Sequence, residues 1–221
     1  IRPKHRASVG PLADLPEEPE LVVIPAGNAI IGDPPRTEHV NVFAIARYPV
    51  TRREYAAFVD ETGHATPASW RDGGTSDERA AHPVEGVSWA DAVAYCRWMT
   101  RRTGRIYRLP DAREWAKAAR GTSGRAWPWG EEPAGRVANT LEAGIGGTAA
   151  VGAFPAGATP EGLYDLVGNV REWTNTYADG RVCRGASYLD PLEASRPSAR
   201  QYAAGDLAGV GFRLVRGMTG R

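Results

Sequence analysis

Glycine and proline recur so closely after Gly121 that the second half of this chain has no room for a long helix or strand. The stretches WPWG, AGIGGT and AGATPEG interrupt it every few residues, and each such residue favours a turn over a regular element. We expect loops around short strands here. A long irregular region in a compact domain is usually functional or held in place, and a bound metal ion is a common way to hold it.

The first half contains three helix signatures, each defined at both ends. The capping boxes and the glycines that end the helices are Thr51 with Glu54 and Gly63, Ser88 with Asp91 and Gly104, and Asp111 with Glu114 and Gly121. Strands are expected in LVVIP, which begins at Leu21, and in VNVFAIARYPV, whose alternation is typical of a half-buried strand. The pattern predicts a mixed α+β domain with a loop-rich second half.

The ends of the chain differ from the body in composition. Residues 1–20 combine four prolines with charged residues, which favours an extended linker or tether, so we place the domain at 21–217 and a short tail at 218–221. No apolar run is long enough to span a bilayer, and the first residues lack the hydrophobic core of a signal peptide. The compartment stays open, with the cytoplasm slightly favoured.

Charge argues against a nucleic-acid or membrane partner. The chain has 27 basic and 26 acidic residues and a formal net charge of +1, whereas binding to phosphate backbones or anionic lipid needs a basic excess.

The reactive side chains are few and scattered. Cys96 and Cys183 are the only cysteines, so either one disulfide or two buried thiols is expected. Cys96 recurs with apolar neighbours at helical spacing, which favours a core position. The four histidines form no metal-ligand pair, and His82, before a proline and near a helix start, is expected to be a hydrogen-bonded support.

Seven segments in order resemble the formylglycine-generating enzyme family, also called sulfatase-modifying factors. They are IARYPVTRREYAAFV, HPVEGVSWADAVAYCRW, YRLPDAREWAKAARG, WPWG, GLYDLVGNVREW, RVCRGASY and GFRLVRG, and the resemblance covers residues 21–217. It implies an α+β fold, the family's variant of the C-type-lectin fold, rich in irregular loops. Arg184, Arg200 and Arg213, in family-like blocks, are expected to support the fold through carboxylate pairing, since a guanidinium group can hold several loop oxygens at once.

The block GLYDLVGNVREW has the best chemical case for a metal. Its carboxylates and freed backbone carbonyls are the oxygen ligands that calcium prefers. Family resemblance implies Ca²⁺ binding by the side chains of Asp165 and Glu172 and the backbone oxygens of Gly168 and Val170, and it places Asn139 in a second calcium site. No acid clearly completes that second site, and Glu142 is the nearest candidate. Without metal, Asp165 and Glu172 would instead bind backbone amides of the turn.

The family's copper chemistry is not expected here. In formylglycine-generating enzymes two cysteines after the RGGSY-like motif hold copper(I), a soft ion that suits thiolates. Their positions are occupied in this chain by Asp190 and, nearby, Ser195. Arg171 replaces a tryptophan of the family's substrate groove, so formylglycine synthesis itself is disfavoured.

Three hypotheses follow for function. The favoured one is a non-catalytic recognition or sensor domain on a calcium-stabilised scaffold, part of a signalling or defence protein or similar to retroelement-diversified variable proteins. It would bind a peptide or small molecule through Arg171, Ser187, Tyr188, Asp190, Glu193, Ser195, Arg196 and Tyr202. The alternative is a metal-dependent oxidoreductase similar to sulfoxide synthases or siderophore-maturation proteins, with Asp190 and Glu193 as an acid/base pair. The third is that residues 181–200 form a structural surface without a ligand.

Overall fold

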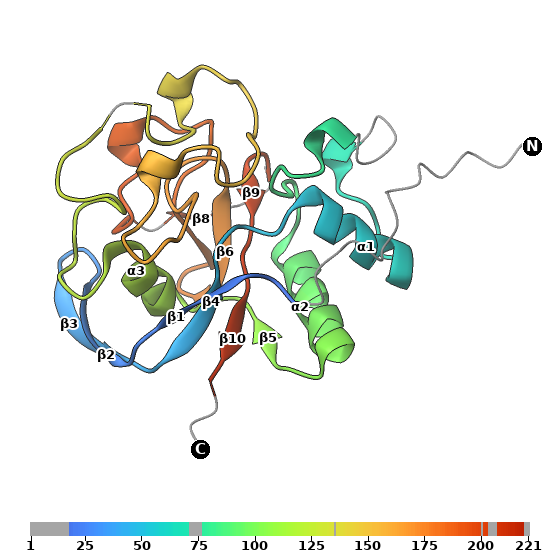
Figure 1. Ribbon diagram of the computed structural model, residues 1–221, viewed down its shortest axis with the longest axis horizontal. Coiled ribbons are helices and arrows are strands. Elements are labelled where there is room, and N and C mark those ends of the chain that lie inside the picture. Colours follow the sequence, from blue (N-terminus) through green and yellow to red (C-terminus); the bar gives the residue numbers. More distant parts are fainter. Residues whose placement is uncertain (1–17, 71–76, 135, 200, 203–206, 219–221) are drawn as a thin grey trace, which may run out of the picture.

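The computed structural model describes residues 18–70, 77–134, 136–199, 201–202 and 207–218, arranged as in Figure 1. Within these residues the helices are α1 (Arg52–Thr62), α2 (Trp89–Thr103) and α3 (Ala112–Arg120). Short 3-10 turns lie at η2 (Ala68–Trp70), η3 (Asp77–Arg79), η4 (Leu141–Ala143), η5 (Pro155–Gly157) and η6 (Leu192–Ala194). Between α3 and residue 171 only turns and 3-10 pieces occur in the described chain, as the glycine and proline pattern predicts.

The strands form three small sheets. The first has the antiparallel order β1 (Leu21–Ile24), β4 (Phe43–Ala46), β10 (Val215–Gly217) and β5 (Tyr107–Arg108). The second is the hairpin of β2 (Gly27–Ile31) and β3 (Arg36–Val40). The third has the order β8 (Gln201–Tyr202), β7 (Arg181–Arg184), β6 (Arg171–Tyr177) and β9 (Val210–Gly211), in which β6 and β9 run parallel. This mixture of small sheets and few helices is an α+β fold.

Strand β4 is buried on both faces, unlike the half-buried strand expected from its alternating sequence. Phe43 and Ile45 belong to one hydrophobic cluster and Ala46 to another, because successive strand residues point to opposite faces. Helices α1 and α2 lie on one side of the first sheet, and α3 with the β2–β3 hairpin lies on the other (Figure 1). Two cores therefore cover the sheet from both sides.

All three predicted capping boxes are present. Thr51, Ser88 and Asp111 are the N-caps, and in each helix the reciprocal side-chain bonds to the first turn are formed. Gly63 and Gly104 end α1 and α2 in the left-handed conformation, with φ of 71° and 69°, which glycine adopts without the steric cost of a Cβ. The helix boundaries expected from the sequence are confirmed.

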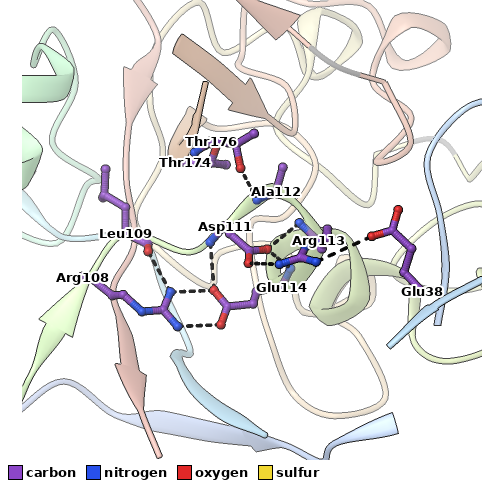
Figure 2. Close-up of polar contacts among 9 residues, drawn as sticks. All are labelled: Glu38, Arg108, Leu109, Asp111, Ala112, Arg113, Glu114, Thr174 and Thr176. Carbon is purple, nitrogen blue, oxygen red and sulfur yellow. Dashed lines mark hydrogen bonds and ion pairs between the residues drawn. The ribbon is translucent and has the colours of Figure 1, made fainter. Parts of the chain in front are cut away.

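The start of α3 is fastened to its surroundings by charged groups (Figure 2). Asp111 accepts hydrogen bonds from two backbone N–H groups of the first turn at 2.8 Å. The Glu114 carboxylate accepts hydrogen bonds from the two terminal guanidinium nitrogens of Arg108, each at 2.6 Å. The Ala112 N–H donates to the Thr176 hydroxyl of β6 at 2.9 Å. These bonds fix α3 against the third sheet.

A fully buried ion pair joins β6 to the segment between β9 and β10. The Arg213 guanidinium donates to both carboxylate oxygens of Glu172 at 2.7 Å, and the indole N–H of Trp115 on α3 donates to the same carboxylate at 2.8 Å. Arg213 and Glu172 are both 0% exposed. Three elements thus meet at one carboxylate.

Arg213 also holds the loops around this pair. Its remaining hydrogen bonds go to the backbone carbonyls of Ala46, Arg47 and Tyr164 at 2.7 to 3.2 Å. Arg184 acts similarly, since it donates to the carbonyls of Ser198 and Ala199 at 3.0 Å. The expected carboxylate pairing is confirmed for Arg213, whereas Arg184 supports the fold through backbone carbonyls, and Arg200 lies outside the described residues.

The segment before β1 contacts the body where it is described. Glu18 pairs with Arg105 and Arg216 and accepts a hydrogen bond from the Tyr107 hydroxyl, while Glu20 pairs with Arg47. Residues 1–17 of the predicted linker and 219–221 of the predicted tail lie outside the described residues. Across the described ranges, none of the helices has the length and apolar character needed to cross a bilayer.

The isolated reactive residues occupy structural positions. Cys96 and Cys183 are both buried thiols, and burial raises the pKa of Cys96 to about 12. His82 lies 3.1 Å from the Thr148 hydroxyl through Nδ1, which confirms its expected role as a hydrogen-bonded support.

We expect Arg213→Met to lower the free energy of unfolding by about 3–5 kcal/mol, because the Glu172 carboxylate is then buried without its cation. Arg113→Met is the control, since the Arg113 pair with Asp111 is half exposed and such a pair contributes about 0–1 kcal/mol. Urea unfolding measures both. Equal losses in the two variants would contradict a special role for the buried pair.

Candidate functional site

The C-terminal strip, residues 181–200, runs from β7 through η6 and lies beside the first residue of β6. Arg171 of β6 donates to Asp190 through Nε at 2.9 Å, and its terminal nitrogen pairs with the other carboxylate oxygen. The backbone N–H and the hydroxyl of Ser187 donate to Asp190 at 2.8 and 2.9 Å. The predicted residues Arg171, Ser187 and Asp190 therefore come together, but they bind one another.

This internal network determines the charge state of Asp190. Burial by itself raises the pKa of the carboxyl, but the hydrogen bonds from Arg171 and Ser187 outweigh it and lower the pKa below its usual value. Asp190 is therefore a stable carboxylate with its oxygens engaged, which makes it a poor general acid.

Two serines of the strip are closed to solvent. Ser187 and Ser195 are both 0% exposed, and the Ser195 hydroxyl donates to the Pro191 carbonyl at 2.7 Å. Neither can contact a ligand without a rearrangement of the strip.

The remaining predicted binding residues are accessible. Glu193, Arg196 and Tyr202 are exposed, and Tyr188 is partly buried. The Tyr188 hydroxyl lies 3.2 Å from a Glu85 oxygen, and Arg196 lies over the buried ring of Trp127 at 5.7 Å. These four residues are the outer residues, whose side chains a ligand can reach; Tyr202 lies just beyond the strip, on β8.

Sequence reasoning missed two residues that shape this surface. Glu85 accepts from Tyr188 and from the Gly209 N–H at 2.9 Å, and Leu189 is 47% exposed beside them. Glu85 lies in the block HPVEGVSW. A charged residue between apolar ones could have indicated a functional position, but the sequence gives no means of identifying Tyr188 as its partner.

The loops after α3 gather a second set of polar groups. The Asn139 amide donates to the Gly147 carbonyl at 2.9 Å and to Asn169 Oδ1 at 3.3 Å, and the Asn169 amide in turn lies 3.4 Å from Asp165 Oδ1. Asp165 accepts its one strong bond from the Gly152 N–H at 2.8 Å. A chain of amides thus links Asn139 to Asp165.

Two of these oxygens are poorly satisfied. Asn139 Oδ1 is buried and has no hydrogen-bond partner among the described residues, and burial raises the pKa of Asp165 against the lowering effect of the Gly152 bond. Buried acceptors normally have partners. A bound cation would satisfy either oxygen.

The comparisons decide the family. Residues 7–218 match the family model described as the sulfatase-modifying factor enzyme 1-like domain. The chain belongs to the sulfatase-modifying factor family. The α+β fold and the family variant of the C-type-lectin fold expected from the seven blocks are thereby confirmed.

Relatives of this sulfatase-modifying factor domain are named for different roles. The "Inactive C-alpha-formylglycine-generating enzyme 2" of Mus musculus is 32% identical over 81% of this chain and 77% of that protein. The "Formylglycine-generating enzyme" of Mycobacterium tuberculosis (strain ATCC 25618 / H37Rv) is 33% identical over 71% of this chain and 74% of that protein. PvdO from Pseudomonas aeruginosa superposes with a TM-score of 0.76 at 28% identity, covering 93% of this chain and 97% of that one.

The copper ion of the formylglycine-generating enzymes does not fit this member of the family. Asp190, which the resemblance sets at the first cysteine position, and Ser195, near the second, have no sulfur. The two thiols, Cys96 and Cys183, lie in the hydrophobic core. Cys183 is the one thiol of the strip and it is buried, so the strip offers no pair of thiolates for copper(I).

The calcium expected from the family fits Asn139 and Asp165 better than it fits Glu172. Asn139 and Asp165 have oxygens to offer, and the Gly168 turn packs against Asn139 so closely that a Cβ on Gly168 would lie 2.5 Å from the Asn139 carbonyl oxygen. Glu172 differs, because both of its oxygens are bonded to Arg213 and Trp115. No set of three His, Cys, Asp or Glu side chains converges within the described ranges.

The other predicted calcium residues have structural contacts. Val170 is buried, so its side chain belongs to the core and only its backbone is relevant to a metal. Glu142, the nearest acid to complete the second site, accepts from the Thr140 hydroxyl and from the Leu192 N–H. Glu142 therefore connects the Asn139 loop to the strip.

We expect Asp190→Asn to lower the free energy of unfolding by about 1–3 kcal/mol at neutral pH, because charge-assisted hydrogen bonds are lost. The folded pKa of Asp190 lies below the unfolded value, so its contribution is complete above the unfolded pKa of about 3.9 and declines as pH falls through the folded pKa. The gap between wild type and variant should narrow in acid.

Urea unfolding between neutral and acidic pH measures this gap. Glu193→Gln is the matched control, since Glu193 is an exposed acid on the same strip and its loss should change stability little at any pH. A gap for Asp190→Asn that stayed constant down to the lowest pH would show that the ion pair is not its source.

Proposed function

We propose that this chain is a non-catalytic recognition domain that binds a peptide or small molecule on a calcium-stabilised scaffold. One observation carries the proposal: the polar atoms of Asp190 and Ser195 are bonded inward, and the family resemblance sets these residues at or near the positions of the copper-binding cysteines. A surface that has lost its reactive groups but keeps exposed aromatic and charged side chains is suited to binding.

Composition of the outer residues supports this view. Tyrosine and arginine are enriched at binding hot spots because they combine a large apolar area with directional hydrogen bonds. Tyr202 is 47% exposed on the edge strand β8, and Tyr188 and Arg196 precede it in the sequence, on the strip. The relative named as inactive shows that the family includes members without the activity.

The recognition proposal predicts that a displayed random peptide library panned on the protein yields enriched sequences. Arg196→Ala with Tyr202→Ala should weaken the enriched peptides by roughly tenfold or more, because hot-spot side chains dominate binding. Arg113→Ala, on a half-exposed arginine of α3, is the control and should leave binding unchanged. Calorimetry measures the affinities, and thermal melts establish that each variant folds.

Two results would overturn the recognition proposal. One is the absence of any enrichment over an unrelated immobilised protein. The other is oxidation of a cysteine-containing peptide by the copper-loaded protein in the presence of oxygen, detected by mass spectrometry, because that reaction requires a catalytic surface.

Calcium is the proposed stabiliser of the loops between α3 and β6. The ligands that the chain offers are the Asp165 carboxylate with the backbone carbonyls of the Gly168 and Val170 turn at the first expected site, and Asn139 Oδ1 at the second. Calcium would neutralise the buried Asp165 charge and provide the missing partner of Asn139. In this arrangement Glu172 stays paired with Arg213 and is not one of the proposed calcium ligands.

We expect EDTA to lower the melting temperature by about 5–10 °C relative to a solution with calcium roughly 100-fold above its Kd. Asn139→Ala and Asp165→Asn should each remove most of that difference, because each removes a proposed ligand. Glu142→Gln should retain it, since Glu142 is bonded to Thr140 and Leu192. Identical melts of the wild type with calcium and with EDTA would disprove the calcium proposal and leave the recognition test unaffected.

A further inference from the structure

The first residue of α1 is a buried arginine. Arg52 is 7% exposed, and within the described ranges its Nε has no hydrogen-bond partner. No carboxylate in the described part of the chain forms an ion pair with it. A buried charge normally requires a partner, and a cation at a helix N-terminus is further disfavoured by the helix dipole. The packing of the described residues therefore does not offset the positive charge of Arg52.

A second orphaned donor lies beside it. The indole N–H of Trp70 is buried and has no partner in the part of the chain that the structure describes, and the Arg52 guanidinium carbon lies 5.4 Å from the centroid of the Trp70 ring. Arg52 Nε and the Trp70 indole N–H are both hydrogen-bond donors, so the partner that each lacks is a hydrogen-bond acceptor. An anion can provide acceptor oxygens, whereas a cation cannot.

Backbone hydrogen bonds place two further basic residues, Arg79 and His82, next to the segment of Arg52. The Arg52 N–H donates to the His82 carbonyl at 2.8 Å, and the His82 N–H donates to the Arg79 carbonyl at 3.0 Å. Arg79 is exposed and has no ion pair among the described residues. Arg52, Arg79 and His82 thus lie on two segments that are hydrogen-bonded side by side.

The local electrostatics agree with this geometry. Burial lowers the pKa of Arg52, and Arg79 lowers it further, while Glu85 raises it. Burial likewise lowers the pKa of His82, the bond to Thr148 opposes this, and Arg79 and Arg52 add to the lowering. The nearby acid, Glu85, is hydrogen-bonded to Tyr188 and Gly209 instead. The three basic groups repel one another.

We propose that Arg52, Trp70, Arg79 and His82 form a binding site for a compact oxyanion of the phosphate or sulfate type. The planar guanidinium fork of Arg52 suits two oxyanion oxygens, the Trp70 indole N–H provides another donor, and the exposed Arg79 provides the entrance and further charge. Glu85 connects this site to Tyr188 of the strip. The inference does not depend on the proposed function, because it concerns the anion alone.

Inorganic phosphate is the probe for the test. The melting temperature of the wild type should be higher in phosphate than in sodium chloride of equal ionic strength, because a ligand of the folded state stabilises it. Calorimetry should give a saturable isotherm. The pKa of His82, followed by NMR, should rise when phosphate binds, since the anion offsets the positive charges of Arg52 and Arg79 that now depress it.

Variants locate the effect. Arg79→Gln should weaken phosphate binding at least about tenfold, since one charge-assisted hydrogen bond is worth about that factor or more, and its exposed position makes it safe for folding. Arg52→Met should abolish the phosphate response and, in buffer without phosphate or sulfate, should melt no lower than the wild type because it removes an unpaired buried charge. Arg113→Met is the control and should respond like the wild type.

Equal melting temperatures in phosphate and sodium chloride, with no calorimetric isotherm, would overturn the proposal. So would a phosphate response that survives in both Arg79→Gln and Arg52→Met. Phosphoserine as a second probe identifies the source of the anion: tighter binding than phosphate supports a phosphate group carried on a larger molecule, and weaker binding supports the free anion.

Discussion

The buried pair of Arg213 and Glu172 is the interaction on which the arrangement of the molecule depends. Through it, β6, α3 and the segment before β10 meet at one carboxylate, and the guanidinium also holds carbonyls of loops far apart in sequence. Such a pair contributes little net stability against an apolar alternative, because both charges were taken out of water. Its value here is that only one arrangement of these loops satisfies every donor of Arg213.

The strip shows the same chemistry near the surface. Arg171 and Asp190 hold one another, and Ser187 completes the network, so these three residues support the structure. The proposed binding surface is limited to Tyr188, Glu193, Arg196 and Tyr202. Of the three hypotheses drawn from the sequence, the purely structural one describes the inner residues of the strip, and the recognition hypothesis remains the proposal for the outer ones.

Paired and unpaired arginines separate the two kinds of site in this molecule. Arg213 and Arg171 have carboxylate partners at hydrogen-bond distance, and they hold structure together. Arg52 is as buried as a structural arginine but lacks such a partner among the described residues. Because an unpaired buried charge is costly, its retention points to a ligand that supplies the missing charge.

The helices and much of the core could be predicted because their signals are local. Thr51 and Glu54 are three residues apart, and a capping box forms within one turn whatever the rest of the chain does. The helical period likewise placed Cys96 in the core. The residues expected to assemble the site were harder, since Arg171 and Asp190 are 19 positions apart and Glu85 is 103 positions from Tyr188.

The sequence by itself determined the family, the three helices and the loop-rich second half, since each follows from residue types at short, fixed spacings. Only the tertiary structure decided which charged groups are neutralised by one another and which remain without a partner. Electrostatic pairing depends on distances between segments that the sequence does not order, so the closed Asp190 network, the orphaned oxygen of Asn139 and the unpaired Arg52 became visible only in the folded chain.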